Sequence, residues 1–239
     1  MYQGLKMAGI KFSALLVLTI FKIGMAAGPM THLYLGEKYC AYHIDSHEKT
    51  EEFLVGTLYP DIRYVAQFPR EKTHSQVNSL DEVSKSPSVF QSGVKFHSWV
   101  DQVREEFVEK SGIYECVIPY AQGKEATLLK FIEEEILAND YDGRTWSGSF
   151  DHIHQEELEF ASEEQIRKWH SMIQYCMGYR ISWLTWAASY LTSHGFGVSS
   201  EVLYEWSYLL PKFANDPRFQ THVRDLLSFI EEKMEESLP

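Results

Sequence analysis

The sequence predicts an all-α protein that forms a single compact multi-helix domain. Apolar residues recur at helical spacing along most of the chain, and the strict alternation typical of strands is scarce. There is no internal repeat and no low-complexity segment. With 239 residues, of which 44% are hydrophobic, the chain can bury one sizeable core. We therefore expect helices packed as a bundle.

The first segment has the pattern of a secretory signal. Lysines precede the apolar stretch FSALLVLTIF (residues 12–21), and small residues follow it. The stretch is shorter than the roughly 20 apolar residues of a transmembrane helix. Cleavage after Ala26 puts Gly24 and Ala26 at the positions that signal peptidase requires to be small. We therefore predict a signal peptide over residues 1–26 and an exported protein, periplasmic or secreted, that begins at Ala27. A retained N-terminal anchor is the alternative.

The mature chain is expected to be helical in most of its length. The segments with helical spacing span residues 32–42, 93–108, 125–137, 162–193, 199–210 and 217–236. Thr31 is the expected N-cap of the first helix. The Trp- and Leu-rich stretch within 162–193 predicts one buried central helix. A short apolar run, 52–58, ends at YPDIRY, and residues 67–88 read as a polar loop over the surface.

Charge and cysteine content exclude some functions. Lys and Arg total 22 and Asp and Glu total 34, so the net charge is −12. This balance disfavours broad, charge-driven binding to nucleic acid or to anionic lipid, although bound metal ions could still make one site locally positive. The three cysteines form no CxxC pair, and we interpret them as structural. No GxSxG, P-loop or GxGxxG motif is present.

Five residues could together hold metal ions. In FHSWVDQV, His97 and Asp101 are four positions apart, so both side chains leave a helix on the same face. Asp61 lies in YPDIR, His74 in KTH, and His32 in THLYLGE. Each has an ordinary explanation alone: a surface ion pair, a helix cap, or an exposed loop histidine. Together, three imidazoles and two carboxylates form a ligand set that zinc prefers.

The motifs GPMTHLYLGEKY, FLVGTLYPDIR, KTH and FHSWVDQ, in this order, resemble the zinc-dependent phospholipase C family and, more distantly, the S1/P1-type nucleases of the same all-α superfamily. The resemblance covers residues 27 to about 107. It implies that His32 binds one zinc together with the amino and carbonyl groups of the mature N-terminal residue. In the nuclease branch that residue lies five positions before the histidine, which here is Ala27.

The same resemblance assigns the remaining ligands. It implies that Asp61, His74 and His97 bind a second zinc, that Asp61 can act as a general base, and that Asp101 bridges the two ions. The family's third zinc uses a histidine at a position that here is Phe107, which cannot bind metal. The later HxxxE pair of the family is kept here as His152 and Glu156 in DHIHQEE, and His154 lies between them. A third site built from these residues and a plain polar loop are both open.

The resemblance implies an exported phosphodiesterase. We expect a phospholipase C that hydrolyses phospholipid head groups at a membrane surface, through a hydroxide that bridges two zinc ions. The alternative enzyme is a single-strand nuclease, for which Trp99, Tyr59 and Tyr64 are candidate base-stacking residues. Nucleic acid is the less expected substrate given the charge. A non-catalytic exported zinc-binding protein is the second alternative. Nothing in the sequence indicates a protein partner.

Overall fold

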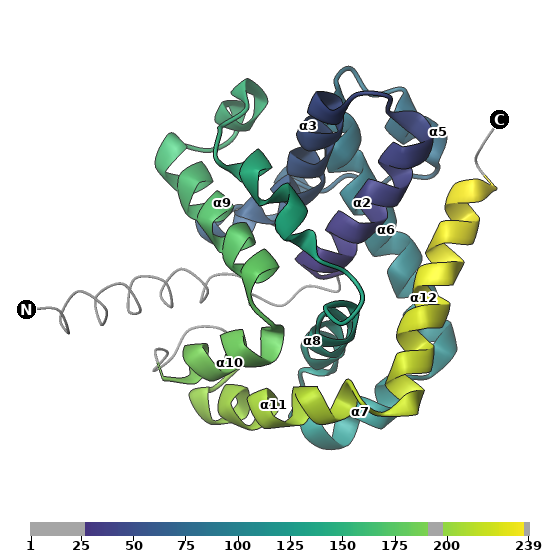
Figure 1. Cartoon of the computed structure of the whole chain (residues 1–239), viewed down its shortest axis with the longest axis vertical. Coiled ribbons are helices and arrows are strands. Elements are labelled where there is room, and N and C mark those ends of the chain that lie inside the picture. Colours follow the sequence, from purple (N-terminus) through teal and green to yellow (C-terminus); the bar gives the residue numbers. More distant parts are fainter. Residues whose placement is uncertain (1–26, 191–197, 237–239) are drawn as a thin grey trace, which may run out of the picture.

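The computed structural model describes residues 27–190 and 198–236 of the chain (Figure 1). Its α-helices are α2 (Pro29–His43), α3 (His47–Leu58), α4 (Arg63–Ala66), α5 (Leu80–Ser84), α6 (Val89–Ser111), α7 (Tyr114–Ala121), α8 (Glu125–Leu137), α9 (Glu163–Gly178), α10 (Ile181–Ser189), α11 (Ser200–Phe213) and α12 (Pro217–Glu235). Short 3-10 helices are η1 (Tyr59–Ile62), η2 (Arg70–Lys72), η3 (Gly143–Phe150) and η4 (Gln155–Glu159). The described ranges contain no strand, which confirms the all-α prediction. The predicted signal peptide lies outside them.

Helices α3 and α6 cross so closely that glycine is needed on both. A Cβ atom on Gly56 would lie 2.2 Å from the carbonyl oxygen of Phe90, and one on Gly93 would lie 2.2 Å from that of Phe53. These are backbone atoms, so a larger side chain would push the helices apart. The close crossing brings the last turns of α3 against the first turns of α6, one turn before His97.

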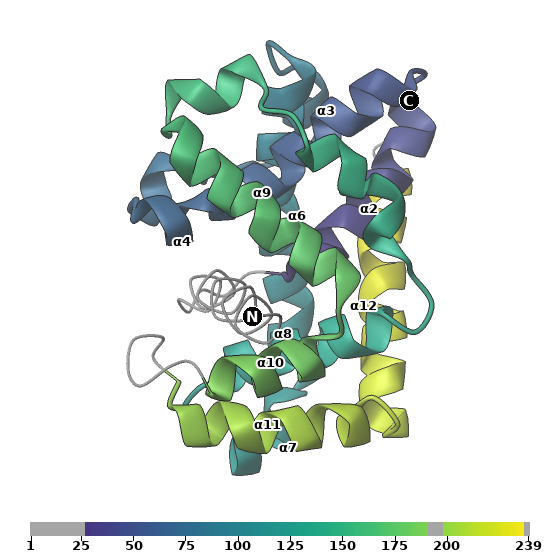
Figure 2. The ribbon, with the colours of Figure 1, turned by 60° about the vertical axis from the view of Figure 1, so that its left-hand side comes forward.

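The buried side chains gather on two sides of the molecule. One core lies among α2, α3, α6 and α9, and the other lies around α8, α10 and α11. Helix α12 joins them, since Leu226 and Ile230 belong to the first core and Phe219 and Val223 to the second. Figure 2 shows the two sides, with α9 and α6 above and α10, α11 and α7 below. The chain thus forms one compact helical domain.

Three sequence predictions of helix placement are wrong. The segment 162–193 is not one buried helix, because the chain is extended at Tyr179 between α9 and α10. Helix α10 packs on α8 and α11 along one side only, which leaves Trp183 and Trp186 46% and 40% exposed. Helix α2 starts earlier than predicted, with Gly28 as the N-cap and Thr31 inside its first turn.

The third error concerns residues 67–88, which are more than a polar surface loop. They contain η2 and α5, and Leu80 and Val83 of α5 are buried in the first core.

Within the described ranges no helix has both the length and the apolar character that crossing a membrane requires. Cys40, Cys116 and Cys176 are free thiols.

Candidate metal centre

Side chains from four parts of the chain meet beside the crossing of α3 and α6. Helix α2 contributes His32, η1 contributes Asp61, the turn after η2 contributes His74, and α6 contributes His97 and Asp101. Ligand atoms of His32, His97 and Asp101 all lie within 4.8 Å of one another, and so do those of Asp61, His74 and His97. Each group could hold a metal ion, so the structure brings together the five side chains that the sequence selected.

Asp101 faces both groups with its two oxygens. Oδ1 lies 3.2 Å from Nε2 of His32 and accepts a hydrogen bond from the backbone nitrogen of Ala27 at 3.0 Å. Oδ2 lies 3.5 Å from Nε2 of His97 and 3.7 Å from Nε2 of His74. A carboxylate placed in this way can bind one ion on each side. Ala27 is fully buried next to it, as expected for a residue of the centre.

The histidine rings are held in fixed orientations. Nδ1 of His97 donates a hydrogen bond to the carbonyl oxygen of Thr57 at 2.9 Å. A neutral imidazole carries one proton, so Nε2 of His97 presents a lone pair to the centre. Nδ1 of His74 lies 2.9 Å from Oγ1 of Thr73, and its Nε2 lies 3.1 Å from that of His97. Such outer hydrogen bonds are typical of histidines that bind metal.

The protonation states suit a cation. Burial lowers the pKa of His74 to about 4, and burial together with neighbouring His32 lowers the pKa of His97 well below its usual 6.5. Burial alone would raise the pKa of Asp101, but His97, His32 and Arg70 outweigh that effect and hold it well below its usual range. Near pH 7, His74 and His97 are therefore neutral imidazoles and Asp101 is an ionised carboxylate, which is the state in which these groups bind metal.

Several buried polar atoms of the centre lack hydrogen bonds. Both ring nitrogens of His32 and Oδ1 of Asp61 are buried without a hydrogen-bond partner. The 3.2 Å approach of His32 to Asp101 does not have hydrogen-bond geometry. Buried polar atoms are nearly always satisfied by a partner, a water or an ion. These orphaned ligand atoms, of the types that zinc prefers, show that the residues present fit a divalent metal.

Two arginines that the sequence analysis did not select also border the centre. Nη2 of Arg70 donates to Oδ2 of Asp101 at 2.7 Å, and Nε of Arg63 lies 3.6 Å from Oδ1 of Asp61. Arg70 precedes His74 by four residues in PREKTH, and Arg63 follows Asp61 by two in YPDIR. Their nearness in the sequence to two predicted ligands was the available signal.

Glu134 on α8 fixes the start of α2. Its carboxylate accepts hydrogen bonds from the backbone nitrogens of Met30 and Thr31, each at 2.9 Å, and from Oγ1 of Thr31 at 2.8 Å. A carboxylate at this position satisfies free amides of the first turn and favours the positive end of the helix dipole. Glu134 therefore positions both Ala27, just before α2, and His32, one turn into it. Nothing in its local sequence indicates this role.

The residues considered for a third zinc form no ligand group with the five in the part of the chain that the structure describes. His152 is exposed, and Glu156 accepts a hydrogen bond from Oγ of Ser88 at 2.7 Å. Phe107 packs against the rings of His222 and Phe229. Among the described residues, no potential ligand group includes His152 or Glu156. Of the two interpretations left open for the HxxxE pair, the described structure therefore lends support only to a polar segment without a metal.

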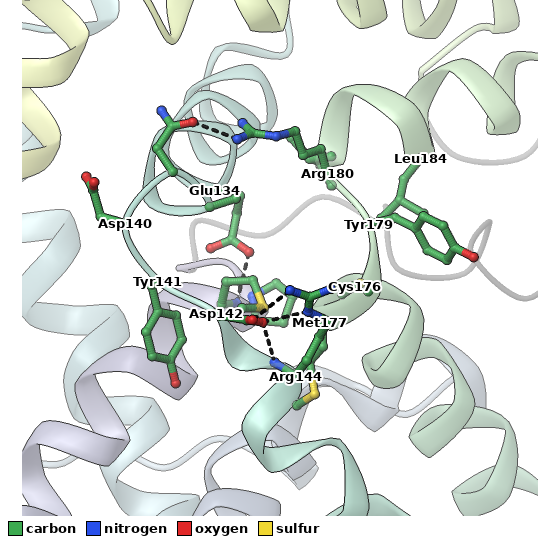
Figure 3. Close-up of a pocket in the computed structure, with 16 residues that line it drawn as sticks. Glu134, Asp140, Tyr141, Asp142, Arg144, Cys176, Met177, Tyr179, Arg180 and Leu184 are labelled. Atoms are coloured by element: carbon green, nitrogen blue, oxygen red, sulfur yellow. Dashed lines mark hydrogen bonds and ion pairs between the residues drawn. The ribbon is translucent and has the colours of Figure 1, made fainter.

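A separate pocket of about 410 Å³ lies between the start of α2 and the chain from α9 to α10 (Figure 3). Met30, Glu134 and Leu184 line it. Figure 3 shows its polar groups joined in pairs, such as Arg144 with Asp142. None of the orphaned buried polar atoms of the described chain belongs to its lining. Among residues 27–190 and 198–236, the groups that could hold a metal ion therefore lie in the first centre.

The comparisons with known proteins identify no relative. No protein-family model, no curated protein and no solved structure matches this chain.

Proposed function

We propose that this chain is a zinc-dependent hydrolase of phosphoric diesters, of the phospholipase C kind. The observation that carries the proposal is the convergence of His32, Asp61, His74, His97 and Asp101, with orphaned ligand atoms and one carboxylate facing both groups. His32 and Ala27 lie on one side of Asp101, and His74 and Asp61 on the other. When bound there, zinc ions supply positive charge to a phosphate group and make water more acidic.

Each residue then has a defined task. Asp101, Asp61 and the three histidines are the proposed ligands of the cations. Asp61 is the proposed general base: its side chain is 12% exposed at the edge of the centre, and its Oδ1 has no hydrogen-bond partner that would compete for a proton. Arg63 and Arg70 add positive charge where a phosphodiester would bind.

The exposed aromatic side chains support a phospholipid substrate. Rings on α10 and α11 and directly beside α10 form a chain of neighbouring contacts, with centroids 4.5 to 6.4 Å apart. These residues are Tyr179, Trp183, Trp186, Tyr190, Tyr204 and Tyr208. Tyr and Trp rings, with an apolar body and a polar atom, suit the boundary between lipid and water. The proposed substrate is therefore a phospholipid head group.

A single-strand nuclease is the second candidate, because the same rings could stack bases. The three residues first suggested for stacking are not available, since Tyr59, Tyr64 and Trp99 are all buried. The net charge of −12 repels a polyanion at long range and places this candidate second. Export from the cytoplasm remains part of the proposal and rests on the signal pattern alone.

The test is zinc stoichiometry and turnover of the chain that begins at Ala27. Two zinc ions per chain are expected, with chelator-sensitive hydrolysis of a chromogenic phosphocholine diester and slower cleavage of single-stranded DNA. Asp101→Asn should keep the helical circular dichroism and reduce turnover by a factor of about 10³ or more, as loss of a metal ligand does. Glu109→Gln makes the same carboxylate-to-amide change on the exposed face of α6 and is the control.

The outcomes separate the candidates. Faster cleavage of DNA than of the diester would make the nuclease the first candidate. Zinc binding without turnover of either substrate would favour the non-catalytic zinc-binding protein. A wild-type chain that binds no zinc, or an Asp101→Asn variant with normal turnover, would refute the proposal.

A further inference from the structure

Arg70 is a charged side chain that reaches from the metal centre toward solvent. Its Nη2 atom lies 2.7 Å from Oδ2 of Asp101, which is itself only 2% exposed. The Arg70 side chain is 37% exposed. One end of this guanidinium is therefore inside the centre, while the rest of the side chain reaches its mouth.

The contact with Asp101 conflicts with a metal ion. Oδ2 is the oxygen that also faces Nε2 of His97 and Nε2 of His74, at 3.5 and 3.7 Å. A cation held by these three atoms would share this oxygen with the Arg70 guanidinium. Two positive charges on one oxygen repel strongly where solvent screening is weak. Metal binding at this oxygen therefore weakens the Arg70 contact and favours its release.

Arg70 is free to leave, whereas Arg63 is not. The Arg63 side chain is 12% exposed. Its Nη2 donates to Oη of Tyr64 at 2.6 Å, and its Cζ lies 4.1 Å from the centroid of the Tyr64 ring. Nη1 of Arg70 is buried without a hydrogen-bond partner, and the contact with Asp101 is the one hydrogen bond that its side chain makes in the described chain. The backbone of Arg70 is fixed, because its carbonyl oxygen accepts from the nitrogens of Thr73 and His74. A displacement would thus involve the side chain alone.

We propose that Arg70 is a phosphate-binding residue that alternates between two partners. It neutralises Asp101 in the metal-free protein, and in the zinc-loaded protein it turns outward and binds the non-bridging oxygens of the substrate phosphate. A guanidinium carries paired donors that match two phosphate oxygens, and its backbone stays anchored beside His74. This inference rests on the proposed function, and it adds that the group recognised at the mouth of the centre is a phosphate anion.

The experiment compares wild type with Arg70→Ala, Arg70→Lys and Lys72→Ala. Lys72→Ala is the control, because it removes a cation of the same 3-10 helix whose ammonium lies over the Phe68 ring instead of at the centre. Zinc affinity is measured by competition with a chromophoric chelator. The affinity of the zinc-loaded protein for inorganic phosphate is measured by calorimetry. Circular dichroism verifies that each variant is folded.

We expect opposite effects on the two affinities. Arg70→Ala should bind zinc about fivefold more tightly, because a competing cation is gone. It should bind phosphate at least about tenfold more weakly, because a charge-assisted pair of hydrogen bonds is lost. Arg70→Lys should keep the zinc affinity of wild type. Its phosphate affinity should lie between those of wild type and Arg70→Ala, because lysine has the charge without the paired donors. Lys72→Ala should match wild type in both.

Two results would overturn the role of Arg70 while leaving the metal centre intact. One is weaker zinc binding by Arg70→Ala, which would make Arg70 a support for the ligands. The other is unchanged phosphate affinity in that variant with zinc bound. A wild-type chain that binds no zinc would instead overturn the proposed function, and this inference with it.

Discussion

Replacing Glu134 with glutamine tests whether α8 positions the metal centre through the start of α2. The carboxylate accepts three hydrogen bonds, two from backbone nitrogens of the first turn and one from Oγ1 of Thr31. Glutamine has nearly the same shape, but it turns one acceptor oxygen into an NH₂ group that faces a donor. It also removes the negative charge from the positive end of the helix. A Cβ on Gly28 would come within 2.5 Å of atoms of the Glu134 side chain, so there is little room to rearrange.

The size of the effect follows from these contacts. A buried amide left without an acceptor costs about 1–3 kcal/mol. The lost charge at the helix terminus adds about 0.3–2 kcal/mol. Part of this is offset, because burial raises the pKa of Glu134 and its ionised form is itself costly. We expect the free energy of unfolding to fall by about 2 kcal/mol. Zinc affinity should fall about tenfold, the equivalent of about 1.4 kcal/mol, because Ala27 and His32 shift with α2.

The next residue supplies a matched control. Glu135 accepts hydrogen bonds from the backbone nitrogen and Oγ of Ser182, so it caps the start of α10. Glu135→Gln should cost similar stability in urea unfolding with chelator present, yet leave zinc affinity unchanged. The reasoning is refuted if Glu134→Gln unfolds at the same urea concentration as wild type, or if both variants weaken zinc binding equally.

Three further perturbations test the helix crossing, a buried ion pair and the N-terminus. Gly93→Ala should reduce the free energy of unfolding by about 1–3 kcal/mol and should also weaken zinc binding, because a Cβ 2.2 Å from a carbonyl oxygen of α3 forces the helices apart. The control is Gly178→Ala, whose Cβ would have no atom within 4 Å and should change neither quantity. Burial alone would raise the pKa of Glu133, but Arg104 and a hydrogen bond from His222 lower it below the usual 4.5. The ionised Glu133 therefore stabilises the fold above pH 4.5, and this contribution is lost as the pH falls through the lowered pKa. In chelator-treated Glu133→Gln, urea unfolding should show a weaker acid destabilisation than wild type, and an identical pH profile would contradict this. A chain with one extra residue before Ala27 should bind zinc more weakly than the chain that begins at Ala27, because the Ala27 nitrogen lies 3.0 Å from Oδ1 of Asp101. Equal zinc affinities of the two chains in the chelator competition would exclude the free amine as a ligand.

Local spacing predicted several of the helices and one pair of the candidate ligands. The predicted helix 125–137 coincides with α8, and the predicted 217–236 differs from α12 by one residue. Hydrophobic periodicity determines a helix and its buried face without reference to distant residues. His97 and Asp101 share a helix face for the same reason. The order of short motifs then selected His32, Asp61 and His74, and the fold brings all five together.

Other features depended on contacts between distant parts of the chain. Glu133, Glu134 and Glu135 look like a solvated acidic run in the sequence, yet all three are buried, with 1%, 5% and 1% of their surfaces exposed. Each is buried because a distant partner meets it: Arg104, the first turn of α2, and Ser182. Likewise, nothing local indicates that Glu156 would bond to Ser88 and not to a metal, or that Arg70 would reach Asp101. Hydrophobic periodicity predicts which side of a helix is buried. The partner of a buried charged side chain is decided only when helices that are far apart in the sequence pack together, because that packing sets the charge and position of the group it meets.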